Sequence, residues 1–173
     1  MRSARPFYRL AALLVMAIPT VTLCQNGAII KQFPIDGTEQ ILTRAGVTFD
    51  REMSSDGNGS LRVEASEVRT VRLLELPVVG IDNTRLIYRA KIKTSGVVGQ
   101  VYLELWCVFP KLGEFFSRGL NQAVSGTKDW TTVETPFFLR KGEKPELLKL
   151  NLVVNGKGKA WIDAIEVRQA PLE

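Results

Sequence analysis

The feature that most limits how this chain can fold is the alternation of apolar and polar residues with a period of two. Leu148, Leu150, Leu152 and Val154 occupy every second position of one such segment. The segment 85–93 alternates in the same way, with a second face that is mostly basic. A period of two places the apolar residues on one face of a β-strand, and no amphipathic run of helical period and length is present. The chain is therefore predicted to be all-β.

Turn residues divide the alternating segments into short strands. "DGNG" at 56–59, "SGVVG" at 95–99 and "NGKGK" at 155–159 are typical of turns. A hairpin is expected at 109–121. The other expected strands are 28–33, 46–50, 61–65, 68–76, 85–93, 100–107, 131–139, 148–154 and 160–168. About ten short strands at this spacing favour an antiparallel sandwich or barrel around one core. Cys107 shares the apolar face of its strand, so it is expected to be buried.

The N-terminus has the pattern of an export signal. Arg2, Arg5 and Arg9 precede an apolar run, 10–23, that is too short for a comfortable membrane span. We therefore expect a signal peptide at 1–24 and a single β-sandwich domain at 25–173. Two alternatives remain open: an uncleaved anchor, and a lipidated Cys24, because "VTLC" loosely resembles a lipobox. Membrane attachment is expected only through this leader or the lipid.

Composition excludes several classes of function. The net charge of the whole chain is +5. The leader carries three arginines and no acids, so the remaining chain has 20 basic and 18 acidic residues and a net charge of +2. No basic stripe is visible, so no nucleic-acid partner is expected. The chain has no histidine, which removes His-dependent triads and the commonest zinc ligand. With no phosphate-binding glycine loop and no nucleophile elbow, the protein is predicted not to be an enzyme.

Four segments in order carry a family resemblance: "DGNGSLRVEA", "RLIYRAKIKT", "DWTTVETPFFL" and "GKGKAWIDAIEV". They resemble the galactose-binding-like jelly rolls, the fold of many bacterial carbohydrate-binding modules, over most of residues 28–168. The chain is also similar to exported bacterial proteins of unassigned ligand that carry "WCVFP" and "GEFFSRGL". The resemblance implies a two-sheet antiparallel jelly-roll sandwich with one concave sheet whose solvent side can bind sugar. The fold hosts many roles, so the ligand must be argued from residues.

The segment "QVYLELW" at 100–106 suggests a binding face. Tyr102, Glu104 and Trp106 point away from the apolar side, so two aromatics flank a carboxylate. Aromatic rings offer flat surfaces to the C–H side of a pyranose, and carboxylates, amides and guanidinium groups bind hydroxyls. By the same parity argument, the predicted ligand-binding residues are Arg89, Tyr102, Glu104, Trp106, Arg118 and Asn151. The alternative is a plain sheet surface on which an arginine pairs with Glu104.

Asp163 is the candidate metal ligand. It shares parity with Trp161 and Ile165, so it is expected to point the same way as apolar residues. A buried acid needs a cation, an arginine or backbone amides as a partner. The resemblance implies a structural calcium ion held by an acid at this place on the last strand. An EF-hand starting at Asp56 is excluded, because Leu61 stands where glycine is required and no helix follows.

Together these observations predict an exported, non-catalytic β-sandwich that binds a carbohydrate or another extracytoplasmic ligand on its concave sheet. The expected partner is a glycan or an envelope protein. The alternative is a structural or protein-interaction module of the cell envelope with no small-molecule site. The exposure of Trp106 separates the two, because a binding surface leaves this ring partly open beside polar groups.

Overall fold

The computed structural model describes residues 27–172. Its strands are β1 (Ala28–Phe33), β2 (Val47–Asp50), β3 (Ser60–Ala65), β4 (Arg69–Pro77), β5 (Thr84–Phe109), β6 (Gly113–Arg118), β7 (Val124–Leu139) and β8 (Leu147–Ala170), with one 3-10 turn, η1 (Leu120–Gln122). The all-β prediction is confirmed. Within this part of the chain, no helix is long and apolar enough to cross a membrane. The predicted leader and Cys24 lie outside the described residues.

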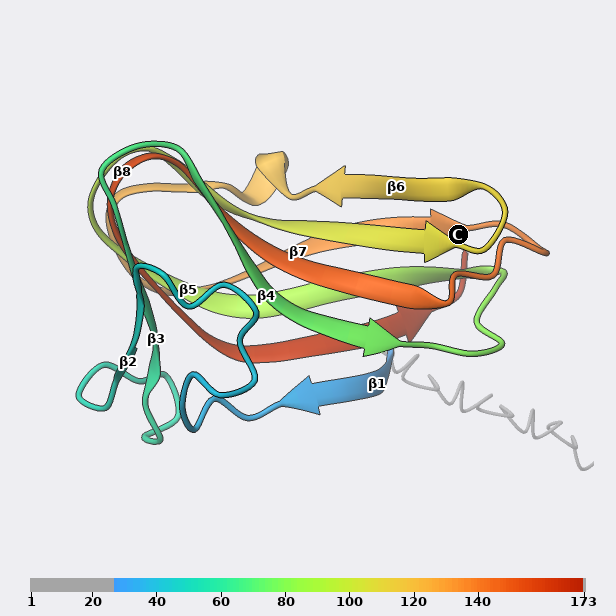
Figure 1. The fold of residues 1–173 in the computed structure, drawn as a ribbon, viewed down its shortest axis with the longest axis horizontal. Coiled ribbons are helices and arrows are strands. Elements are labelled where there is room, and N and C mark those ends of the chain that lie inside the picture. The colour runs from blue at the N-terminus through green and yellow to red at the C-terminus, as the bar shows by residue number, and fades with distance from the viewer. Residues whose placement is uncertain (1–26, 173) are drawn as a thin grey trace, which may run out of the picture.

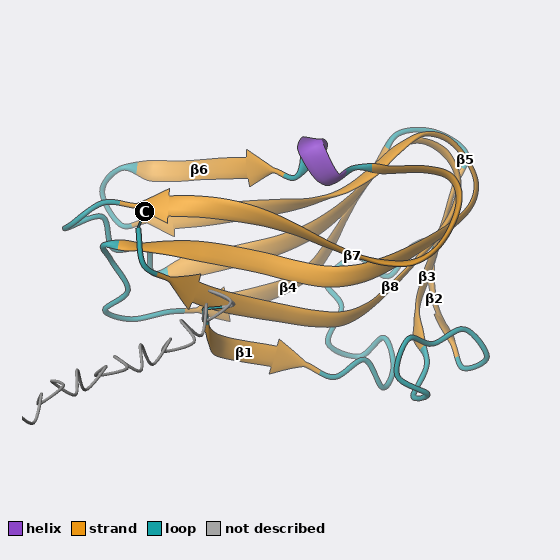
Figure 2. Cartoon of the chain, turned by 180° about the vertical axis from the view of Figure 1, so that it is seen from behind, coloured by secondary structure: helices purple, strands orange, loops and turns teal. Residues whose placement is uncertain are grey.

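The strands form two packed layers, and all pairs are antiparallel. The front sheet contains β4, β8 over 147–154, β5 over 101–109, and β6 (Figure 1). The back sheet contains β1, β8 over 162–170, β5 over 84–92, and β7 over 131–139 (Figure 2). This arrangement is the predicted two-sheet jelly-roll sandwich. Both central strands, β5 and β8, run through both sheets, so the hydrogen bonding is continuous from one layer to the other.

The turns predicted at 95–99 and 155–159 are wrong, because these segments lie inside β5 and β8 respectively. Gly99 and Gly156 face each other in register with φ angles of 117° and 143°. A Cβ atom on either would collide with the opposite backbone, at the carbonyl of Asn155 or of Val98. Glycine therefore lets the two strands bend together without separating. The expected ten strands become eight for this reason.

The core lies between the two sheets. Fully buried side chains from both central strands meet there, among them Leu86, Leu103, Leu150 and Tyr88. The Tyr88 hydroxyl forms no hydrogen bond with another described residue. Cys107 is fully buried, as expected, and burial raises the pKa of its thiol to about 12. A thiol with such a pKa is protonated at neutral pH and is a packing residue.

The free edge of β7 is covered locally by η1. Among the described strands, β7 pairs only with β5, where Pro136 lies opposite Ile87. A proline fits this edge position, since it has no N–H to donate to a neighbouring strand. The side-chain carbonyl of Gln122 accepts the backbone N–H of Glu134 at 2.8 Å. The 3-10 turn thus satisfies one donor that the strand edge leaves open.

Candidate functional site

Side chains from three strands of the front sheet meet around Glu104. The register places Glu104 opposite Arg118 on β6 and opposite Asn151 on β8. Glu104 is 5% exposed. Its Oε1 accepts hydrogen bonds from Trp106 Nε1 at 2.7 Å and from Asn151 Nδ2 at 3.2 Å, and its Oε2 accepts one from Arg118 Nε at 2.7 Å. We call these four residues the Glu104 cluster.

The cluster fixes the charge of Glu104. Burial alone would raise the pKa of this carboxyl, but the hydrogen bonds from Trp106, Arg118 and Asn151 and the charge of Arg118 together lower it. The hydrogen bond to Glu104 in turn raises the pKa of Arg118. Glu104 is therefore ionised at neutral pH. A general acid needs the opposite shift, so this carboxylate is suited to accepting hydrogen bonds and unsuited to donating a proton.

Two aromatic rings form a partly open surface beside the cluster. Trp106 is partly exposed, and its ring centroid lies 4.7 Å from that of Phe116, with the planes inclined at 40°. Phe116 is 47% exposed, and the Arg118 guanidinium carbon lies 4.6 Å from the centre of its ring. We call Trp106 and Phe116 the aromatic shelf. Trp106 thus has the partial exposure beside polar groups that a binding surface requires.

Asn151 has an unused acceptor next to the shelf. Asn151 is 6% exposed, and its Oδ1 has no hydrogen-bond partner among the described residues. An unpaired buried carbonyl costs about 1–3 kcal/mol. The neighbouring Lys149 is occupied by an ion pair with Glu114 at 2.7 Å. Tyr102 completes the face, opposite Val153 of β8, and is 7% exposed.

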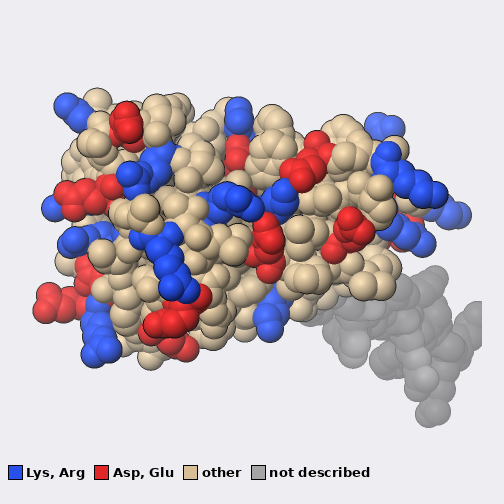
Figure 3. Space-filling model, in the orientation of Figure 1, with Lys and Arg blue, Asp and Glu red and all other residues tan. Residues whose placement is uncertain are grey.

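Charges of both signs are interspersed over this face of the molecule (Figure 3). Paired side chains account for part of the pattern, such as Arg72 with Glu75 at 3.1 Å and Lys149 with Glu114. A nucleic-acid surface would instead show a continuous basic stripe. The front sheet therefore presents a mixed polar surface around an aromatic centre.

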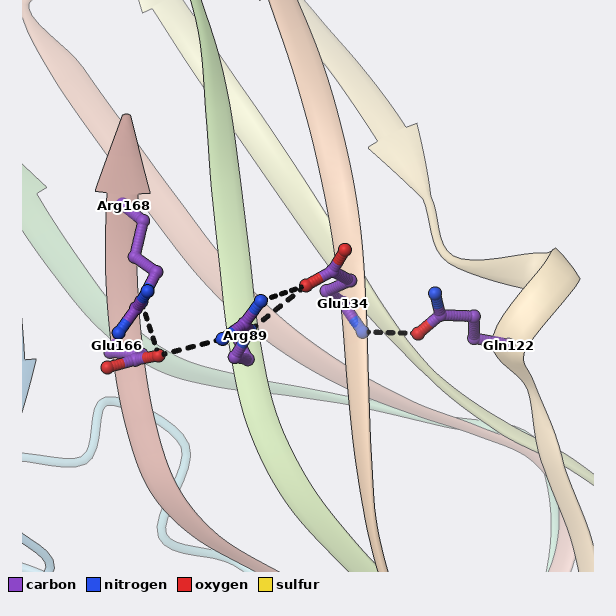
Figure 4. A network of polar contacts seen from close by, with 5 residues as sticks. All are labelled: Arg89, Gln122, Glu134, Glu166 and Arg168. Atoms are coloured by element: carbon purple, nitrogen blue, oxygen red, sulfur yellow. Dashed lines mark hydrogen bonds and ion pairs between the residues drawn. The ribbon is translucent and has the colours of Figure 1, made fainter. Parts of the chain in front are cut away.

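Arg89 does not belong to this site, and its expected grouping with Glu104 is wrong. It lies on the outer face of the back sheet, where its Nε and Nη2 donate to Glu134 at 3.0 and 2.8 Å and its Nη1 is 3.7 Å from Glu166 (Figure 4). Arg168 also donates to Glu166, at 2.7 Å. The cause is the bend in β5: the outward residues before the bend lie on the back sheet, and those after it lie on the front sheet.

A cleft of about 670 Å³ lies over the back sheet, away from the aromatic shelf. Its lining is Gln32, Phe33, Pro34, Ile35, Asp56, Arg89, Ala90, Lys91, Thr132, Asp163, Ala164, Ile165 and Glu166. Charged side chains in this lining already have partners within the protein. Arg89 lies between the carboxylates of Glu134 and Glu166, and Glu166 also accepts a hydrogen bond from Gln32 at 3.4 Å. Its one aromatic ring, Phe33, is only 8% exposed. The cleft offers space but little aromatic surface for stacking.

Asp163 takes backbone amides as its partners. It is 1% exposed, and its two carboxylate oxygens accept the N–H of Ser55 at 2.8 Å and of Ala164 at 2.7 Å. Ala164 has a φ of +50° and forms a bulge, so Ile165 returns to the core while Asp163 faces the cleft. Their expected shared direction is therefore wrong. Across residues 27–172, no three cysteine or acidic side chains are grouped to hold a metal ion.

The structure thus brings together five of the six expected ligand residues and separates the sixth. Phe116 is the functional candidate that the site prediction omitted. The signal for it was present, because Phe116 shares parity with Arg118 two residues later. In the structure it lies directly opposite Trp106. The ion pairs of Arg89 with Glu134 and Glu166 could not be predicted from the sequence, since they depend on which strands are neighbours.

The chain has the β-sandwich jelly-roll fold of carbohydrate-binding modules. The CBM22-1 xylan-binding domain of Xyn10C from Paenibacillus barcinonensis is 18% identical, with a TM-score of 0.61 over 85% of this chain and 97% of that one. A family 16 carbohydrate-binding module is 14% identical, with a TM-score of 0.58 over 82% and 96%. No family model matches the chain, and no curated protein matches it in sequence.

A cyclase from Fischerella sp. TAU is also similar, at 17% identity and a TM-score of 0.55 over 72% of this chain and 70% of that one. Identities this low establish the fold alone. Because binding modules and an enzyme share the architecture, function has to be argued from the side chains on the surface.

Proposed function

We propose that this protein is an exported, non-catalytic carbohydrate-binding module that holds a glycan on the outer face of its front sheet. The observation that carries the proposal is the partly open aromatic shelf beside the buried Glu104 cluster. The shelf supplies the apolar stacking surface, and the cluster supplies polar atoms at fixed positions. Polar groups placed beside aromatic surface are the usual composition of a site for small polar ligands.

Each part of the surface has a role in holding a sugar. The exposed ring faces of Trp106 and Phe116 contact the C–H side of a pyranose. Arg118 uses Nε for Glu104, which leaves its other N–H groups free to donate to hydroxyls. Since the cluster is already ordered by its own hydrogen bonds, little side-chain entropy is lost on binding.

A non-catalytic role is supported by the lowered pKa of Glu104. Glycoside hydrolysis needs two carboxyl groups beside the scissile bond, one of them held protonated. Glu114, the acid nearest to Glu104 along the sequence, forms an ion pair with Lys149. Holding a glycan without cleaving it requires no further acid.

The test is a glycan array followed by calorimetry with xylo-oligosaccharides, since one similar domain is described as xylan-binding. We expect Trp106→Ala to weaken binding by about 1–3 kcal/mol, the range for losing an aromatic anchor. Trp130→Ala is the matched control, because Trp130 is a partly exposed tryptophan on β7. Equal binding by the Trp106 variant and the parent would contradict the proposed site. A chain that binds no glycan would leave the structural or protein-interaction module as the better description.

A further inference from the structure

Three loops and the start of the described chain meet at one end of the sandwich. Loop 78–83 is joined to loop 140–146 by the hydrogen bonds Val78 N to Glu146 O at 3.0 Å and Asn83 N to Arg140 O at 3.3 Å. Loop 140–146 is in turn joined to β5 just before loop 110–112, through the N–H of Glu146 and the carbonyl of Val108 at 2.9 Å. We call this region the loop end. It is the right-hand end in Figure 1.

The loop end exposes large apolar side chains. Val79 is 94% exposed, Leu112 is 64% exposed and Phe138 is 57% exposed. Val79 and Leu112 lie in the loops, and Phe138 is the next-to-last residue of β7. Single exposed apolar residues are ordinary, but three at one end of a molecule, on separate segments, indicate a surface that contacts something apolar.

Basic side chains also lie in two of these loops. Lys111, Arg140, Lys141 and Lys144 are all exposed, and none forms an ion pair with another described residue. Figure 3 shows basic side chains projecting from this end of the molecule. Two acids of the same loops are turned to backbone: Asp82 accepts the N–H of Gly142 at 2.8 Å, and Glu143 accepts the N–H of Arg140 at 2.8 Å. Glu146, which is exposed, is the third acid of these loops, so the loop end carries four cations against three acids.

The described chain also begins at this end. Gly27 lies against the backbone of Gln169, and the Thr84 hydroxyl donates to the Ala170 carbonyl at 2.6 Å beside it. The apolar run 10–23 precedes Gly27 by only a few residues. Gly27 is three residues after Cys24, a separation that can span at most about 10 Å. A leader or lipid that reached a membrane would therefore bring the loop end to its surface.

We propose that the loop end docks on a membrane surface of anionic lipids. Apolar side chains at the tips of loops enter the boundary between headgroups and acyl chains, while lysine and arginine bind the anionic headgroups. The glycan surface plays no part in this contact, since the aromatic shelf lies on the side of the sandwich. The docking holds whether the leader is cleaved or retained, because it uses described residues alone.

The test is co-sedimentation of the protein, as isolated from its native host, with vesicles of phosphatidylglycerol or of phosphatidylcholine. Lys111→Glu combined with Lys144→Glu is expected to lower the apparent affinity for phosphatidylglycerol vesicles by at least roughly 30-fold. Added salt is expected to lower the affinity of the parent protein as well, because it screens the charges. Leu112→Ser is expected to weaken it further. Matched controls come from the opposite end: Val98→Ser, where the valine is 63% exposed, and Lys157→Glu.

Binding that is unchanged by the loop-end variants, or equal on the two lipids, overturns the proposal. Equal losses from the controls overturn it too, since they would indicate a diffuse charge effect. The affinities are compared for protein whose start near Gln25 mass spectrometry has verified, so that a retained leader cannot mask the expected differences. Self-association that Val79→Ser abolishes, measured by sedimentation velocity, would assign the loop end to a second copy of the chain instead.

Discussion

Replacing Glu104 by glutamine tests whether the hydrogen bonds of the Glu104 cluster stabilise the front sheet. Glutamine keeps the shape of the side chain but substitutes an NH2 group for one oxygen. Three donors converge on the two carboxylate oxygens, at 2.7, 2.7 and 3.2 Å. At least one donor must therefore face another donor in the variant.

The expected loss follows from these contacts. A hydrogen bond to a charged group contributes about 1.5–3 kcal/mol, and the remaining bonds weaken when the acceptor becomes neutral. Arg118 can turn to water because its side chain is 44% exposed, which limits the cost on that side. Together these terms give a decrease of about 2–4 kcal/mol in the free energy of unfolding. That is a large share of the roughly 5–15 kcal/mol typical of a domain.

The measurement is equilibrium unfolding in urea at several pH values, followed by tryptophan fluorescence. Because the pKa of folded Glu104 is lower than its unfolded value, its stabilisation is complete above the unfolded pKa of about 4.3 and is lost as the pH falls through the folded pKa. The difference between parent and variant should therefore be constant above about pH 5 and shrink in stronger acid. Glu75→Gln, on the same face, is the control, and its loss should stay within about 1 kcal/mol as for a surface pair.

Two results would refute this reasoning. A Glu104→Gln protein within about 0.5 kcal/mol of the parent at neutral pH would mean that the hydrogen bonds only replace equivalent bonds to water. A stability difference that persists unchanged in strong acid would mean that the charge of Glu104 is not its source.

Three further outcomes are expected. Tyr88→Phe should leave the free energy of unfolding unchanged or raise it by up to about 1 kcal/mol in urea titrations, since the lost hydroxyl bonds to no described residue; a marked loss would contradict this. EDTA should not shift the melting temperature, because both oxygens of Asp163 accept backbone N–H groups, and a fall on chelation would revive the calcium hypothesis. Mass spectrometry of the protein from its native host should find a start near Gln25; a start at Met1 would contradict export with cleavage, and a lipidated Cys24 would favour the lipoprotein alternative.

The local pattern of the sequence was sufficient to predict much of the fold. Strict alternation assigns Val101, Leu103 and Leu105 to the core, and the structure buries all three. The same alternation places Glu104 and Trp106 together on the outer face. A period of two is a property of one strand, so it can be read without knowing the partners of that strand.

The relative placement of strands could not be predicted, because it depends on the path of the chain in space. Glycines at 96, 99, 156 and 158 look like turns in the sequence, whereas the structure uses this region to bend two paired strands. Arg89 was misplaced for that reason alone. The bulge at Ala164 has a similar effect within one strand. It adds one residue with positive φ, so the alternation between core and outer face shifts by one position for the rest of β8.

The position of β8 also determines when the molecule can fold during its synthesis. β1, β3, β4 and β5 all pair with this last strand. Until residues 147–170 have left the ribosome, four strands lack the neighbour that completes their hydrogen bonding. A sandwich built on such distant pairings closes late and relatively slowly. The two sheets therefore cannot close before β8 is available, and the strands that await it stay open to non-native association until then.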